Sequence, residues 1–538
     1  MIKTKQLLNA NVVGSKTRLD SLINPGKEPQ SLGNISNAKN KISIGVADLL
    51  RTLNGLIPDD IIGTNEQVDG VNESDLVKTD GKKIFYVPTG KNKLYVANIA
   101  RNANSIIGEF KFGFKVEDMY ITKDSIIIMG SKNKNGYLQI LDRNTLDSKH
   151  TIEMDASIEG HRMVGKNLFL VGKKVYTQKG KDLRPVIFKD GIEERTAYQD
   201  IFYFVEEEKN LITLLLTVNT ETFATSTSAY LGRFYEHIYM NGDSFFMLEQ
   251  DYNTENVKIF ASRILKFQVN KENSELTYKG MGIVDGFPLN QYSMDEYDGY
   301  LRIVTTETYN NKVTNRLHIL EENPKSDIME IVETLEKGIG KTGESVRSVR
   351  FAKTLVYITT FMNKRYDPVY TIDISDVYNP KFLSATEEDG YNTYLHAWGE
   401  NHLIGIGIAG NFSNINEGIK ISAYKTATSL SKPIDRLEIN NYGTDYSEVI
   451  TNPKSLLISN DKNIIGFPVT NGSDSSFMLY NIDFAGKKVI TKQTELSFKG
   501  AKIDRGIYVN GLIYALTNKG INCYDIDKKK VVDTISLH

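Results

Sequence analysis

The chain is poor in the residues that form covalent or metal cross-links. It has 538 residues but only one cysteine and one tryptophan, and its seven histidines are scattered. A single cysteine excludes an intramolecular disulfide and any zinc site built from cysteines. Cys523 lies in the short alternating segment 521–526, so we expect it to be a small side chain of the core.

Neither a strong net charge nor a long hydrophobic run is present. The formal net charge is −2 at pH 7 and no basic field stands out, so we expect no nucleic-acid partner. No apolar run is long enough to cross a bilayer, and the first residues lack the apolar core of a signal peptide. We therefore expect a protein made in the cytoplasm without a signal peptide and without a membrane span.

What the chain does have is a recurring turn followed by a short apolar strand. Its length exceeds the usual size of a single core, which favours several domains or a repeat architecture. Asn-Gly and Asp-Gly recur in the turns because type I′ turns need positive φ at their central residues. Nine such turns occur, at residues 80–81, 123–125, 165–167, 241–244, 298–300, 352–354, 400–402, 461–463 and 510–511.

These repeats predict an all-β fold, a β-propeller of four-stranded antiparallel blades. They recur at intervals of roughly 40 to 75 residues, which suits such blades with variable loops. Because two of the turns could belong to one blade, we expect about eight blades, with seven as the alternative. The propeller should occupy residues 64–538.

Residues 1–63 differ in character and are predicted to form an irregular N-terminal arm. The arm is rich in polar loops, and one amphipathic stretch, residues 44–56, has the apolar spacing of a short helix. The arm is too polar to bury a core of its own, so it should pack on the propeller or bind a partner. Its partner-binding candidates are Ile44, Val46, Leu49, Leu50 and Leu53.

Several longer motifs carry a family resemblance. They are Thr64-Asn-Glu-Gln-Val-Asp-Gly-Val-Asn-Glu-Ser-Asp-Leu-Val-Lys-Thr-Asp-Gly81, Asp367-Pro-Val-Tyr-Thr-Ile-Asp-Ile-Ser-Asp376 and Tyr394-Leu-His-Ala-Trp-Gly-Glu-Asn-His-Leu-Ile-Gly-Ile-Gly407. Over about residues 60–538 the chain resembles a β-propeller-domain family of bacterial and archaeal proteins, distantly related to WD repeats, mostly secreted and of unknown function. The resemblance implies a propeller and supplies no catalytic residues. The chain departs from the family in having the arm where members usually carry an export signal.

The strand before each turn should be the innermost strand of its blade and face a central channel. Aligning these segments places His161 and His396 at equivalent positions, with charged side chains nearby. Such a channel could bind a polar ligand, or it could be a solvated tunnel whose charges pair with one another, and both interpretations are open. The channel-lining candidates are His161, Asp295, Glu296, Arg347, Arg350, His396 and Glu448.

No catalytic or metal site is predicted from these candidates. His161, His396 and Asp295 could in principle share a metal ion, but equivalent positions in separate blades can lie across the channel from one another. No nucleophile motif of the Gly-x-Ser-x-Gly type occurs. We expect neither a metal nor another cofactor.

The favoured hypothesis is a non-enzymatic structural or interaction protein that binds protein partners, or itself, through the arm. A mostly secreted family and a chain without an export signal together favour release inside a virus particle, so we expect a phage virion component of the tail or collar. The Lys, Asn and Ile-rich composition is compatible with an AT-rich phage genome. Two alternatives are open: a binding module for a cell-surface polymer or protein, and a hydrolase or lyase that uses the channel.

Overall fold

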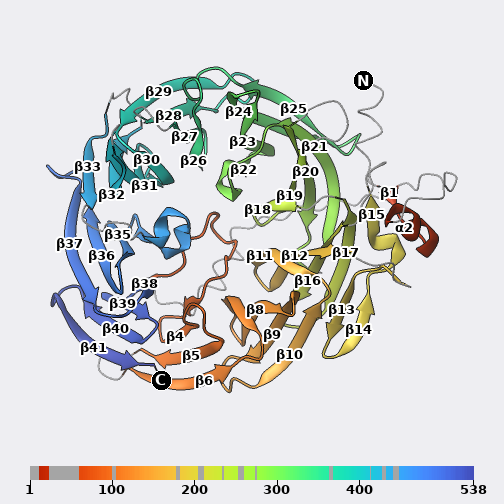
Figure 1. Cartoon of the computed structure of the whole chain (residues 1–538), viewed down its shortest axis with the longest axis horizontal. Helices are drawn as coiled ribbons and strands as arrows, with labels where there is room; N and C mark the ends of the chain where they lie inside the picture. Colours follow the sequence, from red (N-terminus) through yellow and green to blue (C-terminus); the bar gives the residue numbers. More distant parts are fainter. Residues whose placement is uncertain are drawn as a thin grey trace.

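Short antiparallel sheets stand around a central axis in the computed structural model of the protein (Figure 1). Each sheet extends from strands near the axis to strands at the rim. The structure describes residues 11–23, 60–99, 104–176, 182–203, 211–232, 235–252, 260–272, 275–362, 367–411, 414–426, 432–439 and 447–537.

Each blade is a meander of four antiparallel strands, numbered from blade 1 to blade 9 in chain order. Blades 1 to 3 contain β3 (Val77–Thr79), β4 (Lys83–Tyr86), β5 (Lys93–Asn98) and β6 (Ser105–Lys111); β7 (Lys115–Ile121), β8 (Ser125–Lys132), β9 (Asn135–Asp142) and β10 (Ser148–Met154); and β11 (Ser157–Val164), β12 (Asn167–Val175), β16 (Leu211–Asn219) and β17 (Thr225–Leu231). Blades 4 to 6 contain β18 (Tyr235–Met240), β19 (Ser244–Tyr252), β20 (Phe260–Val269) and β21 (Leu276–Asp285); β22 (Met294–Tyr297), β23 (Tyr300–Tyr309), β24 (Lys312–Asn323) and β25 (Ile328–Leu335); and β26 (Ser345–Ala352), β27 (Leu355–Phe361), β28 (Asp367–Asp373) and β29 (Lys381–Glu388). Blades 7 to 9 contain β30 (Tyr391–Trp398), β31 (His402–Asn411), β32 (Asn414–Lys425) and β33 (Asp435–Ile439); β34 (Leu457–Ser459), β35 (Ile464–Asn471), β36 (Asp474–Ile482) and β37 (Ile490–Phe498); and β38 (Ile503–Val509), β39 (Leu512–Thr517), β40 (Gly520–Asp525) and β41 (Lys530–Ser536).

The predicted all-β propeller is confirmed, and its blade number comes out at nine. The described strands form eight hydrogen-bonded sheets, in line with the predicted number of about eight, but one sheet holds eight strands. That sheet consists of blades 4 and 5, joined where Met281 of β21 pairs in parallel with Ile328 of β25. Each of the nine turns read from the sequence therefore precedes the second strand of its own blade, and no two share a blade.

Burial along the strands explains why the sequence pattern changes within a blade. The second strand β8 is buried at six consecutive positions because neighbouring blades cover both of its faces. The outer strand β6 alternates between exposed and half-buried residues, since it lies at the rim. Cys523 is buried in β40, as expected for a core side chain.

The innermost strand pair carries a β-bulge in six blades of the described chain. A bulge bends its strand and redirects the side chains that follow it. In blade 7 the bulge lies between Asn392 and Tyr394, and Gly407 lies opposite. A Cβ atom on Gly407 would lie 1.9 Å from the carbonyl oxygen of Tyr391, so only glycine allows this close approach.

The ring closes between blade 9 and blade 1. The short strand β2 (Ile61–Ile62) pairs with β38 on the inner side of blade 9. The Tyr86 hydroxyl of blade 1 donates to Asp504 Oδ2 of blade 9 at 2.6 Å, and the backbone N–H of Thr89 donates to the same oxygen at 2.9 Å. These contacts join the two ends of the propeller across the closure.

Additional elements extend blades 2 and 3 outward. Blade 2 gains the hairpin β13 (Val186–Lys189) and β14 (Ile192–Arg195), and blade 3 gains β15 (Ile201–Tyr203) and β1 (Asn11–Val12). The helix α2 (Lys16–Ile23) follows β1, and its Leu19 is fully buried against this added layer. Four short 3-10 helices complete the described elements: η2 (Tyr198–Asp200), η3 (Gln291–Ser293), η4 (Glu448–Ile450) and η5 (Pro453–Ser455).

The helix predicted over residues 44–56 lies outside the described residues. The same holds for all five partner-binding candidates, Ile44, Val46, Leu49, Leu50 and Leu53. No described helix has the length and apolar character needed to cross a membrane.

Candidate functional site

Residues 64–76, the central segment, run from blade 9 to blade 1 through the middle of the ring (Figure 1). Asn72 forms an isolated β-bridge with Met163 of blade 3, with N–O distances of 2.8 and 3.1 Å. Asn65 Nδ2 donates to the Tyr394 hydroxyl of blade 7 at 3.0 Å. The segment thus spans the ring and occupies part of the space that an open channel would need.

Three consecutive polar residues of the central segment are almost fully buried. Glu73, Ser74 and Asp75 are 2%, 1% and 3% exposed. Buried carboxylates are stable only when they are paired, and each of the three residues has a partner on a different blade. The contacts are Glu73 Oε1 to Arg162 Nη2 (3.8 Å), Ser74 Oγ to Asp118 Oδ1 (2.5 Å), and both Asp75 carboxylate oxygens to Arg505 Nε (3.0 and 3.1 Å).

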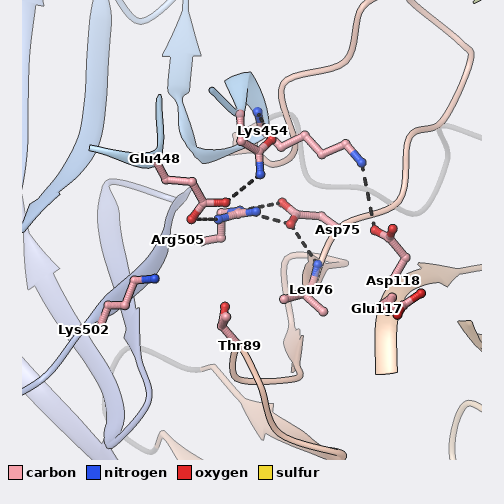
Figure 2. A pocket seen from close by; sticks show the side chains of 10 residues that line it. Asp75, Leu76, Thr89, Glu117, Asp118, Glu448, Lys454, Lys502 and Arg505 are labelled. Atoms are coloured by element: carbon pink, nitrogen blue, oxygen red, sulfur yellow. Dashed lines mark hydrogen bonds and ion pairs between the residues drawn. The ribbon is translucent and has the colours of Figure 1, made fainter. Parts of the chain in front are cut away.

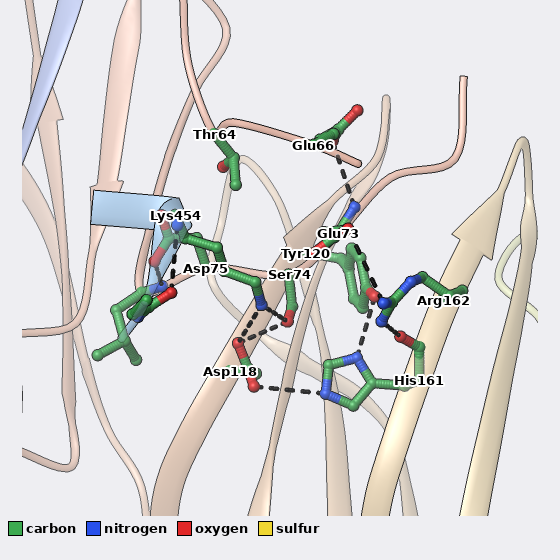
Figure 3. A network of polar contacts seen from close by, with 12 residues as sticks. Thr64, Glu66, Glu73, Ser74, Asp75, Asp118, Tyr120, His161, Arg162 and Lys454 are labelled. Carbon is green, nitrogen blue, oxygen red and sulfur yellow. Dashed lines mark hydrogen bonds and ion pairs between the residues drawn. The ribbon is translucent and has the colours of Figure 1, made fainter. Parts of the chain in front are cut away.

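Asp118 connects the central segment to a histidine of the next blade (Figure 3). His161 Nε2 lies 3.3 Å from Asp118 Oδ2, and His161 Nδ1 lies 3.0 Å from the Tyr120 hydroxyl. Burial alone raises the pKa of Asp118, but the hydrogen bond and charge of His161, helped by Lys454 and Ser74, outweigh it. The pKa of Asp118 therefore lies below its usual range, and the carboxyl is ionised at neutral pH.

This serine, aspartate and histidine do not form a hydrolytic triad. A serine nucleophile needs the histidine between its hydroxyl and the carboxylate, so that the imidazole can take the proton. Here Ser74 donates directly to Asp118, and His161 has one ring nitrogen on Asp118 and the other on Tyr120. The order of contacts is therefore wrong for nucleophilic catalysis, and Ser74 is buried.

A polar cavity of about 340 Å³ lies beside the central segment, where the ring closes (Figure 2). Its lining comes from blades 1, 2 and 9 and from η4 and η5 before blade 8. Within it, Arg505 Nη1 lies 3.2 Å from Glu448 Oε2, and Asn452 Nδ2 donates to Glu448 Oε1 at 2.6 Å. The lining residues are Asp75, Leu76, Thr89, Glu117, Asp118, Glu448, Asn452, Lys454, Lys502 and Arg505.

Two of the predicted channel-lining residues belong to this region. Glu448 lines the cavity, and His161 contacts Asp118 at its edge. The seven candidates are distributed over β11 (His161), β22 (Asp295, Glu296), β26 (Arg347, Arg350), β30 (His396) and η4 (Glu448). They lie on the inner strands of four blades and on η4, and the structure does not bring them into one site.

Asp295 and Glu296 each form an ion pair, one between two strands of blade 5 and the other between blades 5 and 4. Asp295 forms an ion pair with Arg302, which is 2% exposed. Glu296 Oε1 lies 2.7 Å from Lys266 Nζ of blade 4. For these two acids the contacts match the interpretation in which charges along the ring pair with one another.

The other candidates have separate surroundings. Arg347 is exposed, and its guanidinium lies 5.6 Å from the ring centre of Phe361. His396 Nδ1 lies 3.1 Å from the Tyr394 hydroxyl, and burial, with the charge of Arg350, lowers the pKa of His396 to about 3. His161 and His396 therefore have different partners, and no group of three His, Cys, Asp or Glu among the described residues could hold a metal ion.

The sequence interpretation missed Asp75, Lys454, Lys502 and Arg505. Asp75 lies in the polar run after residue 64, which looks like an exposed lead-in because nothing in the sequence signals its burial. Arg505 could have been selected from the sequence, since it lies in the innermost strand before the ninth turn. Lys454 comes from a short 3-10 helix outside the strand pattern.

Glu66, a partly buried acid of the central segment, should make stability depend on pH near neutrality. Burial raises the pKa of Glu66 to about 7 from an ordinary value of 4.5, although the charge of Lys78 lowers it. Between these two values the folded state keeps a proton that the unfolded state has lost, so stability falls as the pH rises across this window. Glu66→Gln should therefore raise Tm by about 1 to 3 °C at pH 8 and leave it nearly unchanged at pH 4.5.

Differential scanning fluorimetry at the two pH values checks this expectation. Glu221→Gln is a matched control, since Glu221 is an acid whose side chain is 65% exposed. The control should show no pH-dependent difference from the wild type. An equal change of Tm for Glu66→Gln at both pH values would contradict the titration of Glu66.

A ring of four-stranded meanders around an occupied centre defines the chain as a β-propeller. It belongs to the family whose model is described as beta propeller domain, which matches residues 62–529. The resemblance read from the sequence is confirmed over this range.

Two relatives are uncharacterized archaeal proteins. One, from Archaeoglobus fulgidus, is 25% identical over 561 aligned residues, covering 88% of this chain and 84% of the relative. The other, from Methanocaldococcus jannaschii, is 26% identical over 462 residues, covering 71% of this chain and 70% of the relative. Among solved structures, a dihydro-heme d1 dehydrogenase is similar with a TM-score of 0.41 and 9% identity, over 81% of this chain and 76% of that chain.

Proposed function

We propose that this protein is a non-enzymatic interaction propeller, a rigid ring that binds other macromolecules and performs no chemistry in its centre. The observation that carries the proposal is the order of contacts around the central segment. Ser74, Asp118 and His161 contact one another in an order that does not activate a nucleophile. The polar residues of the central segment contact Arg162, Asp118 and Arg505 and so join three blades.

The ion pairs across the ring support the same proposal. Arg505 joins the central segment to blade 9 and to η4, and Glu296 with Lys266 joins blades 5 and 4. Paired and buried charges give a fixed arrangement, because an unpaired partner would be costly. A rigid platform of this kind suits binding, since less conformational entropy is lost when a partner docks.

The finer expectations from the sequence stay predictions. Assembly through the N-terminal arm and a place in a phage tail or collar draw no support from family membership, and the arm candidates lie outside the described residues. The binding of a cell-surface polymer or protein is compatible with the same rigid ring.

Two measurements on the full-length protein test the proposal. The purified protein is assayed on a panel of ester, lactone, glycoside and uronide substrates. Its turnover should not exceed that of the variants Asp118→Asn and His161→Gln. In extracts of cells that produce it, the protein should elute from a sizing column well above its own 60.6 kDa, with the partner identified by cross-linking and mass spectrometry. A turnover that either variant abolishes would disprove the non-enzymatic role, and elution as a lone monomer would disprove the interaction role.

A further inference from the structure

The polar cavity at the ring closure has a distribution of charge that points to a ligand. Lys502 is exposed, and no described carboxylate lies within ion-pair distance of its Nζ atom. On the opposite side of the cavity lie Glu117 and Asp118 (Figure 2). The cavity therefore has one wall with a cation that has no acidic partner among the described residues and another wall of carboxylates.

The carboxylates of the cavity are already partnered. Glu117 Oε1 lies 2.7 Å from Lys115 Nζ and accepts from Ser131 at 3.0 Å. Asp118 accepts from Ser74 and contacts His161. An ionised carboxylate has about four lone-pair sites, so each of these acids can still accept a hydrogen bond from a hydroxyl group without needing a second cation.

Lys454 adds a second ammonium group near the centre of the ring. Its Nζ atom lies 4.0 Å from Asp118 Oδ1 and 3.4 Å from Ser74 Oγ, and its side chain is 22% exposed. Neither contact is a close ion pair, so this ammonium group also has capacity for an anionic partner. Asn452 and Thr89 supply neutral polar groups to the same lining.

We infer that the cavity binds a small hydroxylated carboxylate, of the class of the uronic acids. The ligand carboxylate would lie against Lys502, and its hydroxyl groups would donate to Glu117 and Asp118 and exchange hydrogen bonds with Asn452. A volume of about 340 Å³ is at the lower end of the range for small-molecule sites and admits one or two sugar rings. Leu76 is the one apolar residue of the lining, which argues against an apolar ligand.

The site is lined by blades 1, 2 and 9 and by η4 and η5, so its ligand would contact both sides of the ring closure and help to hold the ring closed. A ligand that binds the folded state alone stabilises it by mass action. The inference is independent of the proposed interaction role, because a bound sugar acid can serve a scaffold, a receptor or an enzyme.

Titration calorimetry with matched sugars tests the inference on the full-length protein. D-glucuronate and D-galacturonate should bind at least roughly tenfold more tightly than D-glucose and D-galactose, because only the acids offer a charge-assisted contact to lysine. At concentrations well above Kd, the acids should raise Tm by about 1 to 3 °C. NMR of the recovered sugar shows whether it is bound unchanged or converted, which separates this test from that of the interaction role.

Two lysine variants make the test specific. Lys502→Gln should remove the preference for the acid over the neutral sugar, while Lys499→Gln, an exposed lysine three residues before it, should keep the preference. Both substitutions are on the surface, so both proteins should fold. The assignment would be overturned if neither acid binds or if acid and neutral sugar bind equally. It would also be overturned if Lys502→Gln and Lys499→Gln lose the preference for the acid to the same extent.

Discussion

Replacing Arg505 by methionine is expected to lower the free energy of unfolding by about 3 to 5 kcal/mol. The guanidinium contacts both carboxylate oxygens of Asp75 and lies 3.2 Å from Glu448. Asp75 is 3% exposed, so removing the guanidinium leaves its buried carboxylate without the cation that donates hydrogen bonds to it. This single pair also anchors the central segment to blade 9, and urea denaturation followed by tyrosine fluorescence would measure the loss.

A partly exposed ion pair supplies the matched control for Arg505. Arg184 Nη2 lies 2.8 Å from Asp182 Oδ2, but these side chains are 24% and 26% exposed. Arg184→Met should cost less than Arg505→Met, since this ion pair is partly exposed and its loss leaves no fully buried charge behind. The double variant Arg505→Met with Asp75→Asn should recover part of the stability, and a double variant less stable than the sum of its parts would contradict the pairing.

The second large effect is expected at a buried ion pair between blades 6 and 7. Lys420 Nζ lies 2.6 Å from Glu388 Oε1, and the two side chains are 0% and 2% exposed. Burial raises the pKa of Glu388, but Lys420 and the hydroxyls of Tyr424 and Ser422 outweigh it and hold the pKa below its usual value. Lys420→Met should cost about 3 to 5 kcal/mol at pH 7.5, because it removes the closest counter-charge.

The pH dependence of this variant gives a sharper check than its magnitude. In the folded wild type the pKa of Glu388 lies below its ordinary value of 4.5. The ionised Glu388 therefore contributes to stability above pH 4.5, and this contribution is lost only as the pH falls further. In Lys420→Met, burial is no longer offset by this ammonium group, so the folded pKa should rise above 4.5 and the folded state should take up a proton more readily than the unfolded state. The free energy of unfolding that Lys420→Met loses relative to the wild type should therefore become smaller as the pH falls from 7.5 to 5.

Urea titrations at the two pH values measure this change. Lys528→Met is the control, since Lys528 pairs with Asp525 while its own side chain is 63% exposed. It should lose less than about 1 kcal/mol at either pH. A deficit for Lys420→Met that is the same at pH 7.5 and pH 5 would show that lost packing, not the buried charge, causes the effect.

The propeller could be predicted because its signals are local. In the turn Asp80-Gly81, Gly81 adopts positive φ. The second strand that follows such a turn is apolar, as β8 shows in blade 2, because neighbouring blades cover both of its faces. Such features lie within a few consecutive residues, so one sequence is enough to see them. The blade number was harder to read, because whether two turns share a blade depends on pairing between strands that are distant in the sequence.

The candidate site could be predicted only in part. His161 and Glu448 were found because they lie on or next to innermost elements, which the repeat locates. The same rule also selected Arg347, which is exposed, and Asp295, which is neutralised by Arg302. A position in the repeat determines which strand a residue occupies, but not which partner its side chain finds.

The sequence alone thus determined a repeated, closed all-β ring and its family, since turns and buried strands can be recognised from a few consecutive residues. Only the tertiary structure decided that the polar residues from Glu73 to Asp75 fold into the middle of that ring and pair with Arg162, Asp118 and Arg505. Those partners are 44 to 430 positions away along the chain. A buried ion pair is stable only when both groups leave water together, and that depends on which distant residues the closed ring brings into contact.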